Sequence, residues 1–129
     1  MLYLFYGSDS DKRREKIAKL LASLGEGFAP REINEEEISE LFLDEMSSLQ
    51  GLFGETEVFL FRGVFESKEL KEILKKSAKM LANSQNVFIV SEASATKDFW
   101  GSLEKAGAKV TACAGEDKPG KYDTGNFAL

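Results

Sequence analysis

The amino-acid sequence predicts an α/β protein of three layers, with a five-stranded parallel sheet between helices. Short apolar runs alternate along the chain with longer segments in which apolar residues recur every three or four positions. The runs have the character of strands buried on both faces, and the longer segments that of amphipathic helices. Their strict alternation favours parallel strands joined by right-handed helical crossovers.

The first strand is expected at residues 2–6, an apolar run that ends in a glycine. Residues 8–11 offer Ser and Asp side chains as N-caps for a helix that Gly25 would end. The apolar stripe of this helix consists of Ile17, Leu20, Leu21 and Leu24. Residues 28–33 form a weaker second strand, which Pro30 would confine to an edge of the sheet.

A second helix is expected from Asn34, which makes a capping-box pair with Glu37. Gly51 is expected to stop this helix, because glycine favours the left-handed conformation that follows a helix end. The third strand follows at 58–61. The apolar stripe of the second helix consists of Ile38, Leu41, Phe42, Met46 and Leu49.

The second half of the chain repeats the same alternation. Ser67 would cap a third helix, residues 87–90 form the fourth strand, Thr96 would cap a fourth helix, and residues 109–113 form the fifth strand. The inward positions of the two helices are Leu70, Ile73, Leu74, Ala78, Leu81, Phe99, Trp100 and Leu103.

The composition is that of a globular chain with a single domain. There are 129 residues, of which 43% are apolar and 30% charged. The net charge of −5 argues against unaided binding to DNA or RNA, and no apolar run is long enough to cross a bilayer. Cys113 is the single cysteine, so we expect no internal disulfide and a cytoplasmic location. We expect a domain at 1–113 and a tail or linker at 114–129, where Gly, Asp, Lys and Pro accumulate.

Motifs for nucleotide chemistry fail where the fold would place them. A phosphate-binding loop that starts at Gly7 would need its second glycine at Lys12. The third strand is followed by Arg62 and Gly63, where a nucleotide hydrolase would need acidic residues. Histidine is absent, which removes the commonest general base and zinc ligand. We therefore expect no catalytic residue, metal or cofactor, and a role in binding.

The remaining polar and reactive side chains have ordinary structural interpretations. The basic run 12–14 is expected to be a solvated face balanced by nearby acidic residues, although an anion site is the alternative. Ser91 is expected to bond to a nearby loop, and Cys113 to be a small buried hydrophobe. Two alternatives to an apolar anchor stay open: a small ligand-binding or regulatory domain with a site near Gly7, Asp9, Arg62 and Ser91, and a scaffold that uses the acidic surface of the second helix.

An apolar pair enclosed by glycines is the most informative feature. Leu52 and Phe53 lie between Gly51 and Gly54, directly before the third strand. On spacing alone the pair is either ordinary core or a pair of exposed anchors on a short turn that enters a partner's pocket.

Several segments, in their order and spacing, carry a family resemblance. They are Leu2-Tyr3-Leu4-Phe5-Tyr6-Gly7-Ser8-Asp9, Ser48-Leu49-Gln50-Gly51-Leu52-Phe53-Gly54 running into Val58-Phe59-Leu60-Phe61-Arg62, Asn86-Val87-Phe88-Ile89-Val90, and Lys105-Ala106-Gly107-Ala108-Lys109-Val110 before Cys113. Over residues 1–113 the chain resembles the N-terminal domain of the delta subunit of bacterial DNA polymerase III, the clamp-loader subunit that opens the sliding clamp.

The resemblance implies an AAA+-like core with a degenerate phosphate loop, strand order 5-1-4-3-2 and no ATPase activity. It further implies that Leu52 and Phe53 insert into a hydrophobic pocket of the clamp, the beta subunit. Gly51 and Gly54 would frame the pair, and Gln50 resembles the glutamine of clamp-binding peptides, although it lies one residue closer to the pair. The expected partners are the clamp and other clamp-loader subunits, with no direct contact to nucleic acid or membrane.

Overall fold

A computed structural model describes residues 1–25, 28–50 and 54–114. Its centre is a five-stranded, all-parallel sheet in the order β2-β3-β4-β1-β5, which confirms the predicted fold class and strand order. The strands are β1 (Leu2–Tyr6), β2 (Arg31–Glu32), β3 (Val58–Arg62), β4 (Val87–Glu92) and β5 (Lys109–Ala112).

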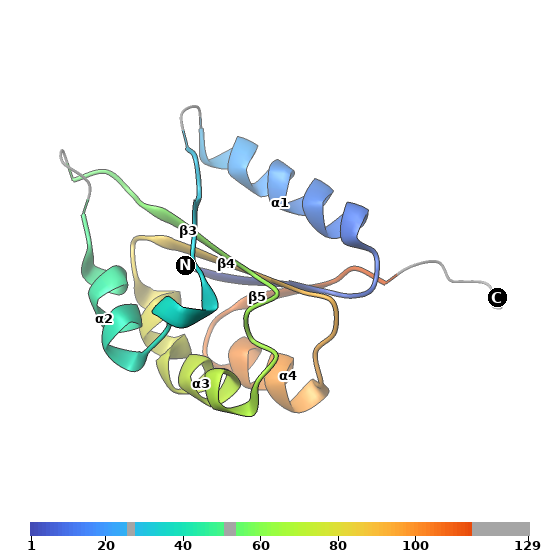
Figure 1. Cartoon of the computed structure of the whole chain (residues 1–129). Helices are drawn as coiled ribbons and strands as arrows, with labels where there is room; N and C mark the ends of the chain where they lie inside the picture. The colour runs from blue at the N-terminus through green and yellow to red at the C-terminus, as the bar shows by residue number, and fades with distance from the viewer. Residues whose placement is uncertain (26–27, 51–53, 115–129) are drawn as a thin grey trace, which may run out of the picture.

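Helices cover both faces of the sheet, but unequally. The helices are α1 (Ser10–Leu24), α2 (Glu40–Ser48), α3 (Lys68–Asn83) and α4 (Lys97–Lys105), and a short 3-10 helix, η1, spans Glu35–Glu37. In Figure 1, α1 lies alone on one face, and α2, α3 and α4 lie together on the other. Within the described residues, no helix is long and apolar enough to cross a membrane.

The core is divided by the sheet into two clusters of apolar side chains. The larger cluster lies under the three helices, where Phe88 of β4 stacks with both Phe59 and Phe61 of β3. The smaller cluster lies under α1, whose apolar stripe packs half-buried against Phe5, Leu60 and other strand residues. No residue of α1 is fully buried.

The predicted second helix is wrong in two respects. The capping box at Asn34 exists, but it starts only the short η1, and α2 begins separately at Glu40 with Ser39 as its N-cap. The break changes which residues face the core, so Leu43 is fully buried, while Leu41 is 67% exposed. Because α2 starts at its own N-cap, the side of the helix that faces the core differs from the side expected for one continuous helix starting at Asn34. A pattern of apolar residues counted across both segments could not reveal this.

Two predicted boundaries also differ from the structure. α2 ends at Ser48 with Leu49 as its C-cap, so the helix stops before it reaches Gly51. β2 is shorter than the predicted segment 28–33, because pairing with β3 begins only after Pro30, which has no amide hydrogen to donate. Ile33 continues that pairing with one backbone hydrogen bond from its nitrogen to the oxygen of Leu60.

Candidate functional site

Of the residues predicted to bind the clamp, only the outer two are among the described residues. Gly51, Leu52 and Phe53 are outside them, so their exposure and contacts remain a prediction. Gln50 and Gly54, which flank the trio, are both exposed. Gly54 has a φ of +76°, in the left-handed region that favours glycine, and a Cβ built there would meet no atom within 4 Å. The residues on both sides of the predicted anchor therefore lie at the surface.

A buried asparagine holds the two ends of this segment together. The side-chain nitrogen of Asn86 donates to the backbone oxygen of Met46 at 2.9 Å and to that of Leu49 at 2.7 Å. Its side-chain oxygen accepts a bond of 2.9 Å from the backbone nitrogen of Glu57. Asn86 has 0% exposure, so this amide is shielded from water, and the three partners of its side chain are all backbone groups. Through one side chain, the end of α2 and the start of β3 are fixed beside β4.

A second contact strengthens the same junction. The hydroxyl of Ser84 donates to the backbone oxygen of Ser47, and accepts from the backbone nitrogen of Asn86 at 3.0 Å. The loop between α3 and β4 is thus bonded to the last turn of α2. The end of α2 and the residue before β3 are consequently held in fixed positions relative to β4.

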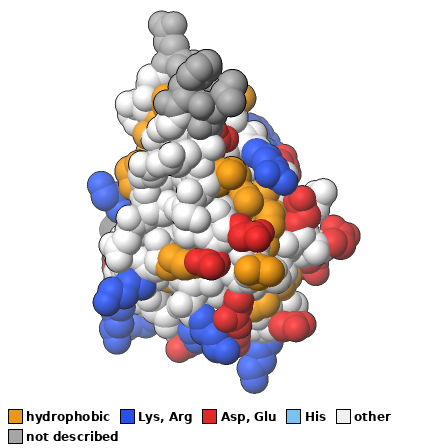
Figure 2. Space-filling model, turned by 90° about the vertical axis from the view of Figure 1, so that its left-hand side faces the viewer, with side chains coloured by type: hydrophobic (Ala, Val, Ile, Leu, Met, Phe, Trp, Pro, Cys, Tyr) orange, Lys and Arg blue, Asp and Glu red, His pale blue; other side chains and the backbone are white. Residues whose placement is uncertain are grey.

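Apolar side chains reach the surface on the α2 side of the molecule. Leu49, the C-cap of α2, is 38% exposed, and Leu41 at the other end of the helix is more exposed still. Figure 2 looks onto this side and shows hydrophobic side chains at the surface between acidic ones. The frame of the predicted anchor thus lies on a surface that already presents apolar groups to solvent.

The loop after β1 has its backbone groups engaged within the protein. Gly7 donates its amide to the oxygen of Glu92 at 3.0 Å, and Asp9 donates its amide to the oxygen of Cys113 at 3.1 Å. Gly7 has a φ of +140°, and a Cβ at this position would overlap the backbone of Cys113. The glycine that begins a failed phosphate loop is therefore explained by the close passage of the chain after β5.

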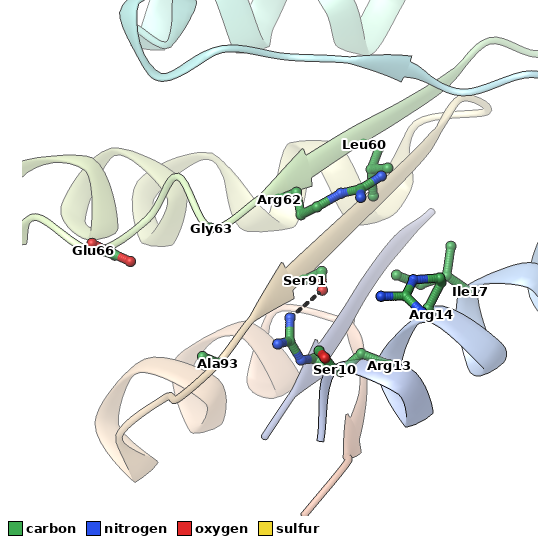
Figure 3. A pocket seen from close by; sticks show the side chains of 10 residues that line it. All are labelled: Ser10, Arg13, Arg14, Ile17, Leu60, Arg62, Gly63, Glu66, Ser91 and Ala93. Carbon is green, nitrogen blue, oxygen red and sulfur yellow. Dashed lines mark hydrogen bonds between the residues drawn. The ribbon is translucent and has the colours of Figure 1, made fainter. Parts of the chain in front are cut away.

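A pocket opens at the carboxyl ends of the central strands, next to this loop. It has a volume of about 280 Å³ and lies between the first turns of α1 and the ends of β3 and β4. Ligands of parallel α/β sheets usually bind at this edge. As Figure 3 shows, the pocket is lined by Ser10, Arg13, Arg14, Ile17, Leu60, Arg62, Gly63, Glu66, Ser91 and Ala93.

Arg13 turns inward to the strand ends. Its Nη1 donates to the hydroxyl of Ser91 at 2.9 Å, and Ser91 is only 3% exposed. The Nε of Arg13 is buried and has no hydrogen-bond partner among the described residues. A buried donor without a partner costs about 1–3 kcal/mol, and more when the group is charged. The prediction that Arg13 belongs to a solvated face is therefore wrong. Ser91 does bond to a nearby loop, because its backbone oxygen accepts from the amide of Gly63 at 2.8 Å, but its hydroxyl bonds to Arg13 of α1.

The other two guanidiniums of the pocket make exposed ion pairs. Arg14 pairs with Asp11 at 2.9 Å, which confirms for Arg14 the predicted balance of charge on a solvated face. Arg62 pairs with Glu32 at 3.6 Å, across the edge between β3 and β2. Pairs as exposed as these contribute about 0–1 kcal/mol, so they restrain the guanidiniums only weakly.

The structure brings together only part of the alternative ligand site suggested by the sequence. Arg62 and Ser91 line one pocket, whereas Gly7 and Asp9 do not. The rest of the polar lining, to which no motif spacing pointed, consists of Ser10, Arg13, Arg14 and Glu66. The one available signal was the basic run at the start of α1, where cations oppose the helix dipole.

Burial changes the ionisation of two side chains near this edge. It raises the pKa of Glu92, whose carboxylate accepts a hydrogen bond of 3.2 Å from the backbone nitrogen of Phe65. Burial also raises the pKa of the Cys113 thiol. Cys113 is fully buried and packs in the α1-side cluster, which confirms the prediction of a small buried hydrophobe. No group of His, Cys, Asp and Glu in the described ranges is arranged to hold a metal ion.

Comparison with known proteins adds no identification. No protein-family model matches the chain, and no curated protein matches it.

Proposed function

We propose that this chain is a non-catalytic module that grips the bacterial sliding clamp, as the N-terminal domain of a clamp-loader delta subunit acting in cytoplasmic DNA replication. The observation that carries the proposal is the buried Asn86, which fixes both ends of the segment containing Leu52 and Phe53. An anchor works best when it is presented from a fixed frame, because less conformational entropy is then lost on binding.

Two further features support the proposal. The strand order is the one that the resemblance to the delta family implies. The amides of Gly7 and Asp9, which a phosphate loop would offer to a nucleotide, are already bonded to backbone oxygens. Both features fit a domain of the AAA+ type that no longer uses its first loop to hold ATP.

The mechanism is insertion of two apolar side chains into a pocket of the clamp. Burying a leucine and a phenylalanine stabilises a complex by about 1.5–3 kcal/mol each, and anchors in well-packed pockets reach about 2–4 kcal/mol. The clamp opens when this module binds the open or strained ring more tightly than the closed ring, because only differential affinity shifts an equilibrium.

The direct test replaces the predicted anchors. We expect Leu52→Ala with Phe53→Ala to leave the fold intact and to abolish binding to purified beta clamp in titration calorimetry. Leu41→Ala is the matched control, since it removes an exposed leucine in the first turn of α2, at the end of the helix away from Gln50. Clamp affinity unchanged in the double variant, or unfolding of that variant, would contradict the proposal.

A second variant tests the frame without touching the anchors. We expect Asn86→Ala to weaken clamp binding while Leu52 and Phe53 remain in place, because the ends of the segment lose their common attachment. Circular dichroism before the titration establishes that the variant is folded. Wild-type affinity in folded Asn86→Ala would show that the frame has no part in binding.

A further inference from the structure

We propose that the pocket between α1 and the ends of β3 and β4 binds the phosphate group of a small phosphorylated molecule. This site is separate from the clamp anchor. The pocket lies at the carboxyl ends of the strands, whereas residues 50–56 precede the amino end of β3. Phosphate binding in this pocket does not depend on clamp binding, and the two can be tested separately.

The charge of the lining favours an anion. Three guanidiniums, those of Arg13, Arg14 and Arg62, come from two elements far apart in the sequence and line one cavity. Glu66 is the single carboxylate among the lining residues. Guanidinium groups bind phosphate oxygens through paired N–H donors, and they do so more strongly than neutral donors.

Arg13 is the central phosphate ligand in this proposal. It makes no ion pair with another described residue, and its guanidinium donates to the neutral hydroxyl of Ser91. Its buried Nε lacks an acceptor within the described part of the chain. A cation in this position has unused donor capacity, which an anionic oxygen would satisfy.

Arg14 and Arg62 can join Arg13 at little cost. Their present partners, Asp11 and Glu32, are exposed carboxylates that do not line the pocket. Exposed ion pairs are weak, so a phosphate in the cavity competes with them effectively. Figure 3 shows the three arginines arriving from α1 and from the end of β3.

The shape and the walls of the pocket indicate a small organic ligand in addition to the phosphate. Its volume of about 280 Å³ lies just below the usual range for small-molecule sites, about 300–1,000 Å³, so it would suit a small ligand. Ile17, Leu60 and Ala93 supply apolar wall beside the arginines. Glu66 and Ser10 offer acceptors for hydroxyl groups. The amides of Gly7 and Asp9 in the loop after β1 already donate to backbone oxygens. The phosphate would therefore be held by side chains.

Titration calorimetry on the full chain at constant ionic strength tests the site. The probes are ribose 5-phosphate, inorganic phosphate and ribose, so that the organic part and the anion are measured separately. We expect saturable binding of ribose 5-phosphate, weaker binding of inorganic phosphate and no binding of ribose. Arg13→Gln and Arg62→Gln should each weaken ribose 5-phosphate binding about tenfold or more, the scale of a lost charge-assisted hydrogen bond.

The matched control removes a positive charge from α1 outside the pocket. Lys19 pairs with Glu15 and does not line the cavity, so Lys19→Gln should change affinity less than about twofold. Equal weakening by Lys19→Gln and Arg62→Gln would overturn the proposal, as would the absence of saturable binding in the millimolar range. Should Arg13→Gln fail to fold, the exposed Arg14 and Arg62 still decide the question through Arg14→Gln and Arg62→Gln.

Discussion

At the residue scale, buried polar groups define the structure beside both candidate sites. Asn86, Ser91 and Glu92 lie within or just before β4, and all three are buried. Each has a specific partner: backbone groups for Asn86, Arg13 for Ser91 and the Phe65 amide for Glu92. Buried polar side chains are costly unless they are bonded, so each fixes its neighbours in one arrangement. The central strand β4 thus aligns the anchor frame at one end and the pocket at the other.

Glu92 makes stability depend on pH in an unusual direction. Burial raises its pKa above the ordinary value of 4.5, so the folded state holds this proton more tightly than the unfolded chain does. The stability that goes with the protonated form is present below pH 4.5 and is lost as the pH rises through the folded-state pKa. Paired carboxylates with lowered pKa values act in the opposite direction.

Glu92→Gln should remove this dependence, because the amide keeps an oxygen for the Phe65 hydrogen bond but carries no charge. We expect the variant to gain stability relative to the wild type as the pH rises from about 4 to about 7. Urea denaturation of both proteins at stepped pH values gives the difference. A difference in unfolding free energy that stays constant over this range would show that Glu92 does not control it.

The sequence predicted the pocket only in part: it placed Arg62 and Ser91 near one site, but it did not place Arg13 there. Arg62 and Ser91 are register partners on the adjacent strands β3 and β4, and the packing of α1 against the ends of these strands brings Arg13 to them. The basic run at 12–14 was visible, but spacing does not reveal that Arg13 turns inward while Arg14 stays in solvent. The rotation of a helix about its axis is set by tertiary packing, and the local sequence does not determine it.

At the element scale, the junction between β1 and β5 depends on one glycine. The backbone of Cys113 passes so close to Gly7 that a Cβ has no space, and the amides on both sides are bonded across the gap. The end of β5 and the start of α1 are therefore joined through backbone contacts, independently of side chains.

Gly7→Ala should consequently destabilise the protein more than Gly63→Ala does. Gly63 also has a positive φ, of +65°, but a Cβ there would point into open space. Gly63→Ala then carries only the left-handed backbone penalty of about 1–2 kcal/mol, whereas Gly7→Ala adds a clash with backbone that cannot move aside. Thermal or urea unfolding gives both values. Equal losses would mean that the end of β5 shifts freely.

Regular elements with their own caps were predictable from the sequence, while α2 was not. α3 begins after its predicted cap Ser67 and buries its predicted stripe at Leu70, Leu74 and Leu81. For α2, two cap signals follow in succession at Asn34 and Ser39, and a helical period that spans both hides the break between them. Periodicity is informative only where a single helix underlies it.

At the scale of the whole molecule, the strand order was predictable because it came with a family resemblance. The alternation of runs established parallel strands, but alternation alone allows several orders. The unequal covering of the sheet, with one helix against three, follows from the crossovers once the order is known. Residues 51–53 and 115–129 lie outside the described structure, so the anchor pair and the predicted tail remain predictions.

The single helix on one face of the sheet implies that this face has a lower local stability than the other. α1 has no fully buried residue, whereas α3 buries five. Native-state hydrogen exchange should therefore find that the amides of α1 open at a lower free energy than those of α3. Exchange at equal rates in the two helices would contradict this. Arg13 and Arg14 belong to α1, and Arg62 belongs to β3. A ligand that contacts all three would therefore raise the free energy at which α1 opens from the sheet.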